Sequence, residues 1–304
     1  MAEAASTLNR GRILAAIATQ IGQGEIAFPT SARLALRIRN TLDDPDCDVG
    51  TVARLIQADP LLAARIVALA NSTLFTRPGR VISDVPGAVS RVGFSVVRTL
   101  ATALVTRQIA GAPARAEYRD MAAALWAHTT HMAALAYVLA RRVTHQDPDT
   151  AMFAGLVHEV GGFYLISRAG DFPGLLDGGL ASDWMDDGDD DVEISGEGSS
   201  AGKRSFESRI GHAILEALSV PAVIIAAVDT LWHGYLTLPP ESLGDTLLLA
   251  NQLAPVPSPF DRQRQGVAQG AAATIDMLVE DVTLADILKE AAADVEALAA
   301  ILRG

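Results

Sequence analysis

The stretch FAGLVHEVGGFYLI, residues 153–166, places a histidine and a glutamate side by side in an otherwise apolar run. On a buried helix, His158 and Glu159 mark either a metal site or the remnant of one, because imidazole and carboxylate groups are common ligands of divalent cations. Just upstream, Asp147 and Pro148 supply an N-cap and a first helical residue. The stretch therefore predicts a buried helix and raises the question of whether its polar pair still binds a metal.

The same helix signals recur along the chain. In ADPLLAARIVALANS, residues 58–72, Asp59 is the predicted N-cap and Pro60 the first helical residue. Ser95 begins another helix directly after Gly93, and Pro221 separates two further helices. The tail at residues 283–304 places its apolar side chains on one helical stripe, and no segment alternates as a strand would. These patterns predict an all-α protein.

Composition narrows the classes of function. The chain has 304 residues, half of them hydrophobic and 5% aromatic, with a net charge of −12. Such a charge repels phosphate backbones, so we expect no nucleic-acid binding. The short cluster of Arg33, Arg37 and Arg39 is interpreted as a solvated helix face.

The single cysteine and the absence of targeting signals bear on the compartment. Cys47 excludes an intrachain disulfide, and the carboxylates around it should raise the pKa of its thiol, so it is not a predicted nucleophile. The first residues lack the apolar core of a signal peptide, and no run of about 18 apolar residues occurs. We expect a cytoplasmic protein without membrane insertion.

An acidic segment followed by Gly and Ser, residues 182–205, predicts a mobile surface loop. It is not a calcium-binding EF-hand loop, because Met185 and Ile194 stand where oxygen ligands are needed. It is not a phosphate-binding P-loop either, because Arg204 follows Lys203 in place of Ser or Thr. Whether this loop binds a partner stays open.

Five segments in order across residues 26–236 resemble the HDOD family, the output-domain relatives of HD-type metal phosphohydrolases. They are LIQADPLLAARIVALANSTLF, ISDVPGAVSRVGFSVVRTLATALV, LWAHTTHMAALAYVLA, AGLVHEVGGFYLI and RIGHAILEALSVPAVIIAAVDTLWH. The positions that match the family signature are Asn71, Ser72, Gly93, Gly155, Pro221 and His233. The resemblance implies a multi-helix, two-lobed bundle over residues 26–236. Residues 1–25 would be a helical lead-in, and residues 237–304 a C-terminal helical extension with a Pro-rich break.

The resemblance also implies where a metal site would lie. A catalytic HD enzyme binds one or two divalent metals through a His, an adjacent His-Asp pair and a later Asp. The corresponding positions here are His128, His158, Glu159 and Asn251. Glu is one methylene longer than Asp, so its oxygens should miss the position that a rigid helix fixes, and Asn is a neutral, poorer ligand. We therefore expect a vestigial site with no catalytic residue, no bound metal and no cofactor.

Structural roles for these residues stand beside the functional ones. His158 and Glu159 can form hydrogen bonds with neighbouring helices, and His128 and His131 can pack on one helix face. Asn71 and Ser72 either face a partner or close backbone hydrogen bonds at a helix end. The degenerate pocket could also retain a small ligand.

Three functions follow from the resemblance. The first is a non-enzymatic signal-transduction or scaffold module that contacts other signalling proteins in trans, as in family members that are often bacterial. The second is a metal-dependent phosphohydrolase acting on a nucleotide or cyclic dinucleotide. The third is a small-ligand sensor that uses the degenerate pocket. We predict the first, and the sequence leaves open whether the chain forms a homodimer.

Overall fold

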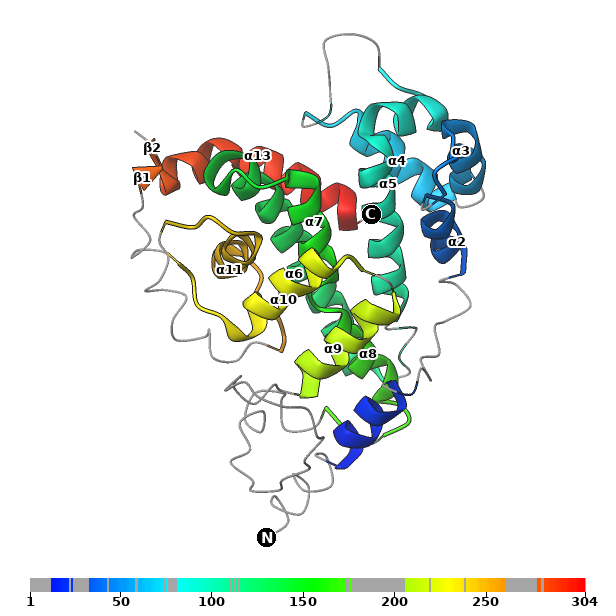
Figure 1. Cartoon of the computed structure of the whole chain (residues 1–304), viewed down its shortest axis with the longest axis vertical. Coiled ribbons are helices and arrows are strands. Elements are labelled where there is room, and N and C mark those ends of the chain that lie inside the picture. The colour runs from blue at the N-terminus through cyan, green and yellow to red at the C-terminus, as the bar shows by residue number, and fades with distance from the viewer. Residues whose placement is uncertain are drawn as a thin grey trace.

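The computed structural model describes residues 12–21, 23, 33–42, 44–57, 60–73, 75, 81–109, 111, 113, 115–172, 175–176, 206–218, 220–237, 239–260, 278–279 and 282–303. Most of these residues are helical, which confirms the all-α prediction (Figure 1). After a first helix at Arg12–Ile21, the elements are α2 (Arg33–Leu42), α3 (Val49–Gln57), α4 (Pro60–Ala70), α5 (Val85–Ile109), α6 (Ala116–Leu139), the π-helical turn η2 (Ala140–Thr144), α7 (Pro148–Val157), α8 (Val160–Arg168), α9 (Phe206–Ala217), α10 (Ala222–His233), α11 (Leu243–Leu253), β1 (Leu278–Val279), β2 (Val282–Thr283) and α13 (Leu284–Arg303). The two strands form one short antiparallel hairpin.

Helix α6 is the centre of the fold. Every residue from His128 to Ala140 is buried, so the second half of the helix has no solvent-exposed face. It packs against α7, α8, α11 and α13. It continues into η2, after which His145 adopts a left-handed conformation with φ 52°. A polar side chain on this half of α6 is therefore held in the interior.

Helix α5 bends sharply at Gly93, where φ is 84° and ψ is 164°. Residues with a side chain rarely adopt this conformation, and the second part of the helix begins just after it, as the Gly93–Ser95 pattern predicts. By length and composition α5 could cross a membrane, but 65% of its most apolar window is buried within the protein. It packs against α2, α3, α4, α7 and α8, as a core helix does.

The Asn-Ser pair at the end of α4 closes backbone hydrogen bonds. Asn71 Nδ2 donates to the carbonyl oxygens of Val67 and Ile82, at 3.0 and 2.7 Å. Its Oδ1 accepts from the Ile82 amide at 2.9 Å, and Ser72 Oγ donates to the Leu69 carbonyl at 2.8 Å. The Asn71 side chain therefore ties the end of α4 to the segment that leads into α5.

Helix α7 begins as the sequence predicts. Asp147 accepts a hydrogen bond from the Thr150 amide at 2.7 Å, and Pro148 is the first helical residue. Helix α4 likewise begins at Pro60, whereas its predicted N-cap Asp59 lies outside the described residues. The predicted boundary at Pro221 is also present, between α9 and α10.

The His-Glu pair does not lie within a continuous helix, contrary to the prediction. Helix α7 ends at Val157, His158 and Glu159 form a turn, and α8 begins at Val160. Glu159 has φ −97° and ψ 18°, outside the helical region. The expectation that a rigid helix fixes the position of the Glu159 carboxylate is therefore wrong, because the chain changes direction at this residue.

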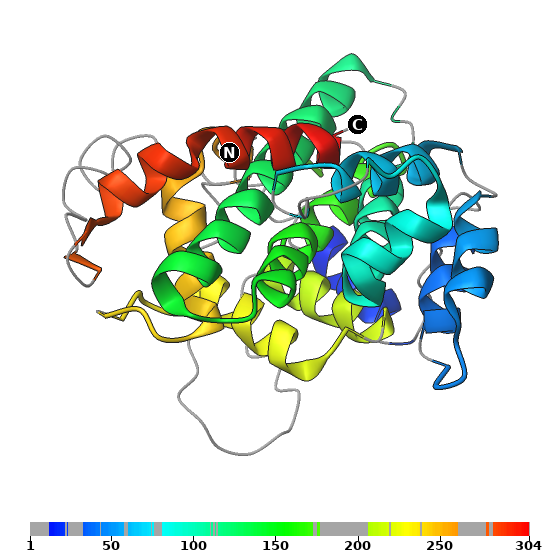
Figure 2. The same ribbon diagram turned by 90° about the horizontal axis from the view of Figure 1, so that it is seen from above.

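The C-terminal part of the chain packs onto the same centre. Helix α11 begins with a capping box between Ser242 and Asp245, and it contacts α6, α7 and α10. Seen from above, α13 crosses the molecule from the hairpin toward α4, and it lies along α6 (Figure 2). Six residues of the predicted stripe are buried, and Leu288 is only partly so; the six are Leu284, Ile287, Ala291, Val295, Leu298 and Leu302. The predicted loop at 182–205 lies outside the described residues.

Candidate metal centre

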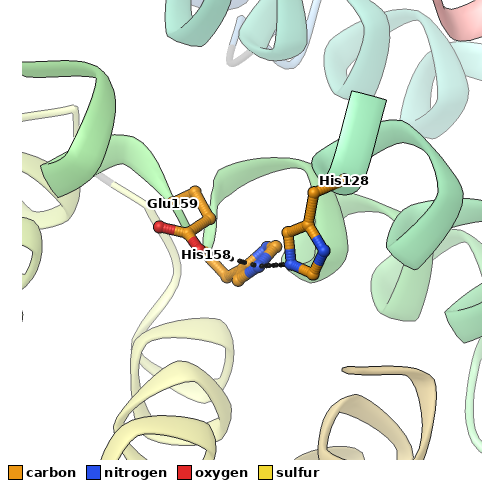
Figure 3. A group of neighbouring side chains, drawn as sticks. All are labelled: His128, His158 and Glu159. Carbon is orange, nitrogen blue, oxygen red and sulfur yellow. Dashed lines mark hydrogen bonds and ion pairs between the residues drawn. The ribbon is translucent and has the colours of Figure 1, made fainter. Parts of the chain in front are cut away.

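Three side chains with metal-binding groups meet below the surface of the protein. His128 comes from α6, and His158 and Glu159 come from the turn between α7 and α8. One ligand atom from each lies within 4.8 Å of the other two. The three residues are only 1%, 3% and 8% exposed. Figure 3 shows the two imidazole rings turned toward each other, with the Glu159 carboxylate beside them. We call this group the His-His-Glu cluster.

Backbone carbonyls fix which ring nitrogens carry hydrogen. His128 Nδ1 lies 2.7 Å from the Val256 carbonyl oxygen, and His158 Nδ1 lies 2.7 Å from the Gly155 carbonyl oxygen. A carbonyl can only accept, so each Nδ1 must donate a hydrogen. In the neutral rings, both Nε2 atoms therefore keep a lone pair. This is the arrangement in which protein groups orient histidine ligands around a metal.

The two Nε2 atoms lie 3.3 Å apart, in rings that meet edge to face at 63°. Two lone pairs at this separation repel each other unless a proton or a cation lies between them. Two imidazole nitrogens that share one ion at about 2.0–2.1 Å lie roughly 2.8–3.4 Å apart at octahedral to tetrahedral angles. The nitrogen positions therefore fit a single divalent cation as well as they fit a shared proton.

The glutamate supplies the negative charge of the cluster. Glu159 Oε1 lies 3.8 Å from His158 Nε2. The carboxylate of Glu159 lies against Gly162, because a Cβ added at Gly162 would lie 3.2 Å from Glu159 Oε2. Two neutral imidazoles and one carboxylate form a donor set suited to Zn²⁺, Fe²⁺ or Mn²⁺. The longer side chain of Glu reaches the histidines because it starts from a helix break.

The segment that follows α11 covers the cluster. Val256 provides the carbonyl that holds His128. Phe260 is 9% exposed, and its ring would be 2.9 Å from a Cβ at Gly162, which places it beside the Glu159 carboxylate. The Pro-rich break predicted in this region is therefore an irregular segment, residues 254–260, that lies over the site.

The other predicted positions are placed as follows by the helices that carry them. Asn251, the fourth matched position, lies on α11, the helix that leads to Val256 and packs against α6. Gly155 lets α7 approach α6, because a Cβ there would be 2.7 Å from Ala133 Cα. Pro221 is the N-cap of α10 and His233 is its last residue.

His131 belongs to a different contact. Its Nδ1 lies 2.8 Å from the Ala127 carbonyl, and its Nε2 lies 3.4 Å from Glu296 Oε2 on α13. It therefore joins α6 to α13 rather than the His-His-Glu cluster. The predicted packing role fits this geometry.

Sequence reasoning did not identify the groups that orient the cluster. The carbonyls of Gly155 and Val256 are backbone atoms, so no residue type marks them. In the sequence, Phe260 is only one apolar residue in a Pro-rich stretch.

The prediction for Cys47 is confirmed. Burial, and then Asp48 and Asp44, raise the pKa of its thiol.

Comparisons with known proteins extend this description. Residues 28–177 match the HDOD domain family model. A candidate metal-dependent phosphohydrolase from Shewanella amazonensis SB2B is similar in structure, with TM-score 0.66 and 19% identity over 97% of this chain and 99% of that one. An HDOD domain protein of unknown function from Geobacter sulfurreducens gives TM-score 0.55 and 19% identity, over 94% and 96%. A candidate signal transduction protein from Marinobacter aquaeolei VT8 gives TM-score 0.52 and 20% identity, over 92% of this chain and 60% of that one. No curated protein matches the chain.

At these identities the solved structures show a shared fold. The family match runs from before α2 to beyond α8, so it contains both elements that carry the His-His-Glu cluster. It also contains the Asn71 clamp and the bend at Gly93. The sequence signature, the helical fold and the family match agree, and the chain belongs to the HDOD domain family.

Proposed function

We propose that this protein is a cytoplasmic signal-transduction module that acts through contacts with other signalling proteins and does not hydrolyse phosphoesters. The observation that carries the proposal is the enclosure of the His-His-Glu cluster. Its three residues are at most 8% exposed and lie beneath Val256 and Phe260. A metal phosphohydrolase must admit a phosphoester to its metal and leave room for the attacking water. A buried cluster of three side chains suits a role inside the fold better.

Within this proposal, the cluster still fits a cation. His128, His158 and Glu159 would hold it, and α6 would be joined to the turn between α7 and α8. When bound, such an ion supplies Lewis-acid character and lowers the pKa of a coordinated water. Because the ligands come together only in the folded chain, binding would stabilise the native state.

A second candidate function is a metal-dependent phosphohydrolase. The observation in its favour is that both Nε2 atoms converge with their tautomers set by backbone carbonyls. The description of the Shewanella amazonensis protein names the same class of activity for that protein. This candidate requires residues 254–260 to move away so that a substrate reaches the cluster.

A turnover assay separates the two candidates. The purified protein is loaded with Mn²⁺, Fe²⁺ or Zn²⁺ and desalted, and its metal content is measured by elemental mass spectrometry. Hydrolysis of bis(p-nitrophenyl) phosphate and of a cyclic dinucleotide is then followed, beside His158→Ala. As a matched control, His212→Ala removes a histidine that pairs with Asp229 elsewhere. We expect no turnover above that of His158→Ala with any metal.

Metal-dependent turnover in the wild type and in His212→Ala that disappears in His158→Ala contradicts the proposal. That result would establish the hydrolase instead. Retained metal without turnover agrees with the proposal and assigns the cluster a role in stability.

A further inference from the structure

A second site lies between α5, α7 and α10. A pocket of about 290 Å³ opens there, lined by α5 and α7 and by the start of α10. None of the residues of the His-His-Glu cluster lines it. Helix α7 contacts both α5 and α10 (Figure 1). The pocket therefore lies where the N-terminal helices meet the second half of the fold. Its volume is near the lower end of small-molecule sites.

One wall of the pocket carries a carboxyl group with no hydrogen-bonding or charged partner among the described residues. Asp149 lines the pocket and forms no hydrogen bond or ion pair with any residue that the structure describes. Burial, and then the nearby Asp147, raise the pKa of Asp149 to about 6. A partly buried carboxylate without a donor is destabilising, and it is a natural partner for a cationic group of a ligand.

The α5 wall carries the opposite charge. Arg98 lines the pocket, and its Nη2 donates to the Leu42 carbonyl at 2.9 Å, which anchors the side chain against α2. Ser95, Thr99 and Thr150 also line the pocket, and their hydroxyl groups can donate or accept hydrogen bonds. The wall therefore offers a guanidinium with nearby polar groups, which suits a carboxylate.

Two helix beginnings add to the positive side. The second part of α5 begins after the bend at Gly93, and α10 begins after Pro221. Each has residues in the lining of the same pocket. The partial positive charge of a helix N-terminus favours an anionic group, and here it supports Arg98. Phe153 and Ile224 supply an apolar surface beside these groups.

We propose that this pocket binds a small zwitterion of the free α-amino acid class, with its ammonium group at Asp149 and its carboxylate at Arg98. A purely anionic ligand would be repelled by Asp149, and a purely cationic one by Arg98. A molecule with both charges satisfies both walls, and the apolar surface receives its side chain. The bound molecule bridges α5 to α7 and α10, so its presence stabilises their packing. This site is independent of the function proposed above.

Thermal unfolding tests the proposal on the full chain. Each of the twenty L-amino acids is added singly, beside its matched primary amine and its matched carboxylic acid. A ligand at roughly one hundred times its Kd should raise Tm by about 4 °C for a chain of this size. We expect such a rise with at least one amino acid, and a smaller rise with either half of that molecule.

Variants separate binding in this pocket from binding elsewhere. In Asp149→Asn the rise should fall by more than half, and titration calorimetry should show at least a ten-fold weaker Kd. Asp171→Asn makes the same chemical change at an exposed aspartate that pairs with Arg168, and it should keep the rise. The proposal is overturned by the absence of a rise with all twenty, by a rise that persists in Asp149→Asn, or by an equal rise with the amine or the acid alone. Circular dichroism confirms that the variants are folded.

Discussion

Replacing Gly155 with alanine tests how closely α6 and α7 must pack to form the His-His-Glu cluster. An added Cβ would lie 2.7 Å from Ala133 Cα and 3.1 Å from its amide nitrogen, both of them backbone atoms. Ordinary contact begins at 3.4 Å, so the helices must separate by about 0.7 Å. Overpacking of this kind costs roughly 1–3 kcal/mol, and the closeness of backbone to backbone places Gly155→Ala at the upper end.

Alanine also favours the helix by about 1 kcal/mol relative to glycine, which offsets part of the cost. The expected net loss of stability is therefore about 2 kcal/mol, or a fall in Tm of about 3 °C for a chain of this length. Thermal unfolding followed by circular dichroism at 222 nm measures this change. Gly170→Ala is the matched control, because a Cβ there meets nothing within 4 Å. A Gly155→Ala protein that melts at or above the wild type would refute the packing argument.

Three further predictions concern polar groups whose environment is set by the fold. Asn71→Ala removes hydrogen bonds to two backbone segments and should lower the free energy of unfolding by about 2 kcal/mol. Urea denaturation measures this change. The control Ser90→Ala, which removes an exposed hydroxyl, should alter the free energy of unfolding little. Burial and Asp147 raise the folded-state pKa of Asp149 to about 6. The contribution of protonated Asp149 to the free energy of unfolding is therefore complete below the unfolded-state pKa and is lost as the pH rises through 6. Asp149→Asn should therefore be more stable than the wild type by about 1 kcal/mol at pH 8, after allowance for solvent screening, and equal to it near pH 4; equal stability at both pH values would contradict this. Burial opposes ionisation of Asp245, but hydrogen bonds from Ser242 and Thr237 outweigh it and lower the pKa. Its stabilisation is present above the ordinary aspartate pKa and lost as the pH falls through the lower folded-state value, so Asp245→Asn should be less stable than the wild type at pH 7, and the difference should shrink in acid.

The enclosure of the cluster and the open pocket suggest a division of roles within one fold. The His-His-Glu cluster lies at the centre, where α6 meets the turn between α7 and α8. The pocket at Asp149 and Arg98 lies where α5 meets α7 and α10. Helix α7 takes part in both, because Asp149 is in its first turn and His158 directly follows its end. A ligand that fixes α7 against α5 could therefore affect the cluster at the other end of the same helix.

Helix boundaries followed from local chemistry and were predictable from the sequence. Asp147 with Pro148, Gly93 before Ser95, and Pro221 act through their own backbone angles and hydrogen bonds, which neighbouring residues determine. The break at His158 and Glu159 was not predictable in this way. Both residues, and the apolar ones around them, are compatible with a continuous helix, and the turn becomes visible only in the packed structure, where α8 lies against α5, α6 and α9.

The sequence by itself determined the all-α class, the family and the three residue types of the cluster, because helix propensity, capping and motif order are local properties of the chain. Only the tertiary structure decided that His128 meets His158 and Glu159, that carbonyls of Gly155 and Val256 set both imidazole tautomers, and that residues 254–260 cover them. The pocket between α5, α7 and α10 is likewise a product of packing, since Arg98 and Asp149 are 51 positions apart in the chain. Contacts between distant segments depend on how whole helices pack, and no short stretch of sequence encodes that by itself.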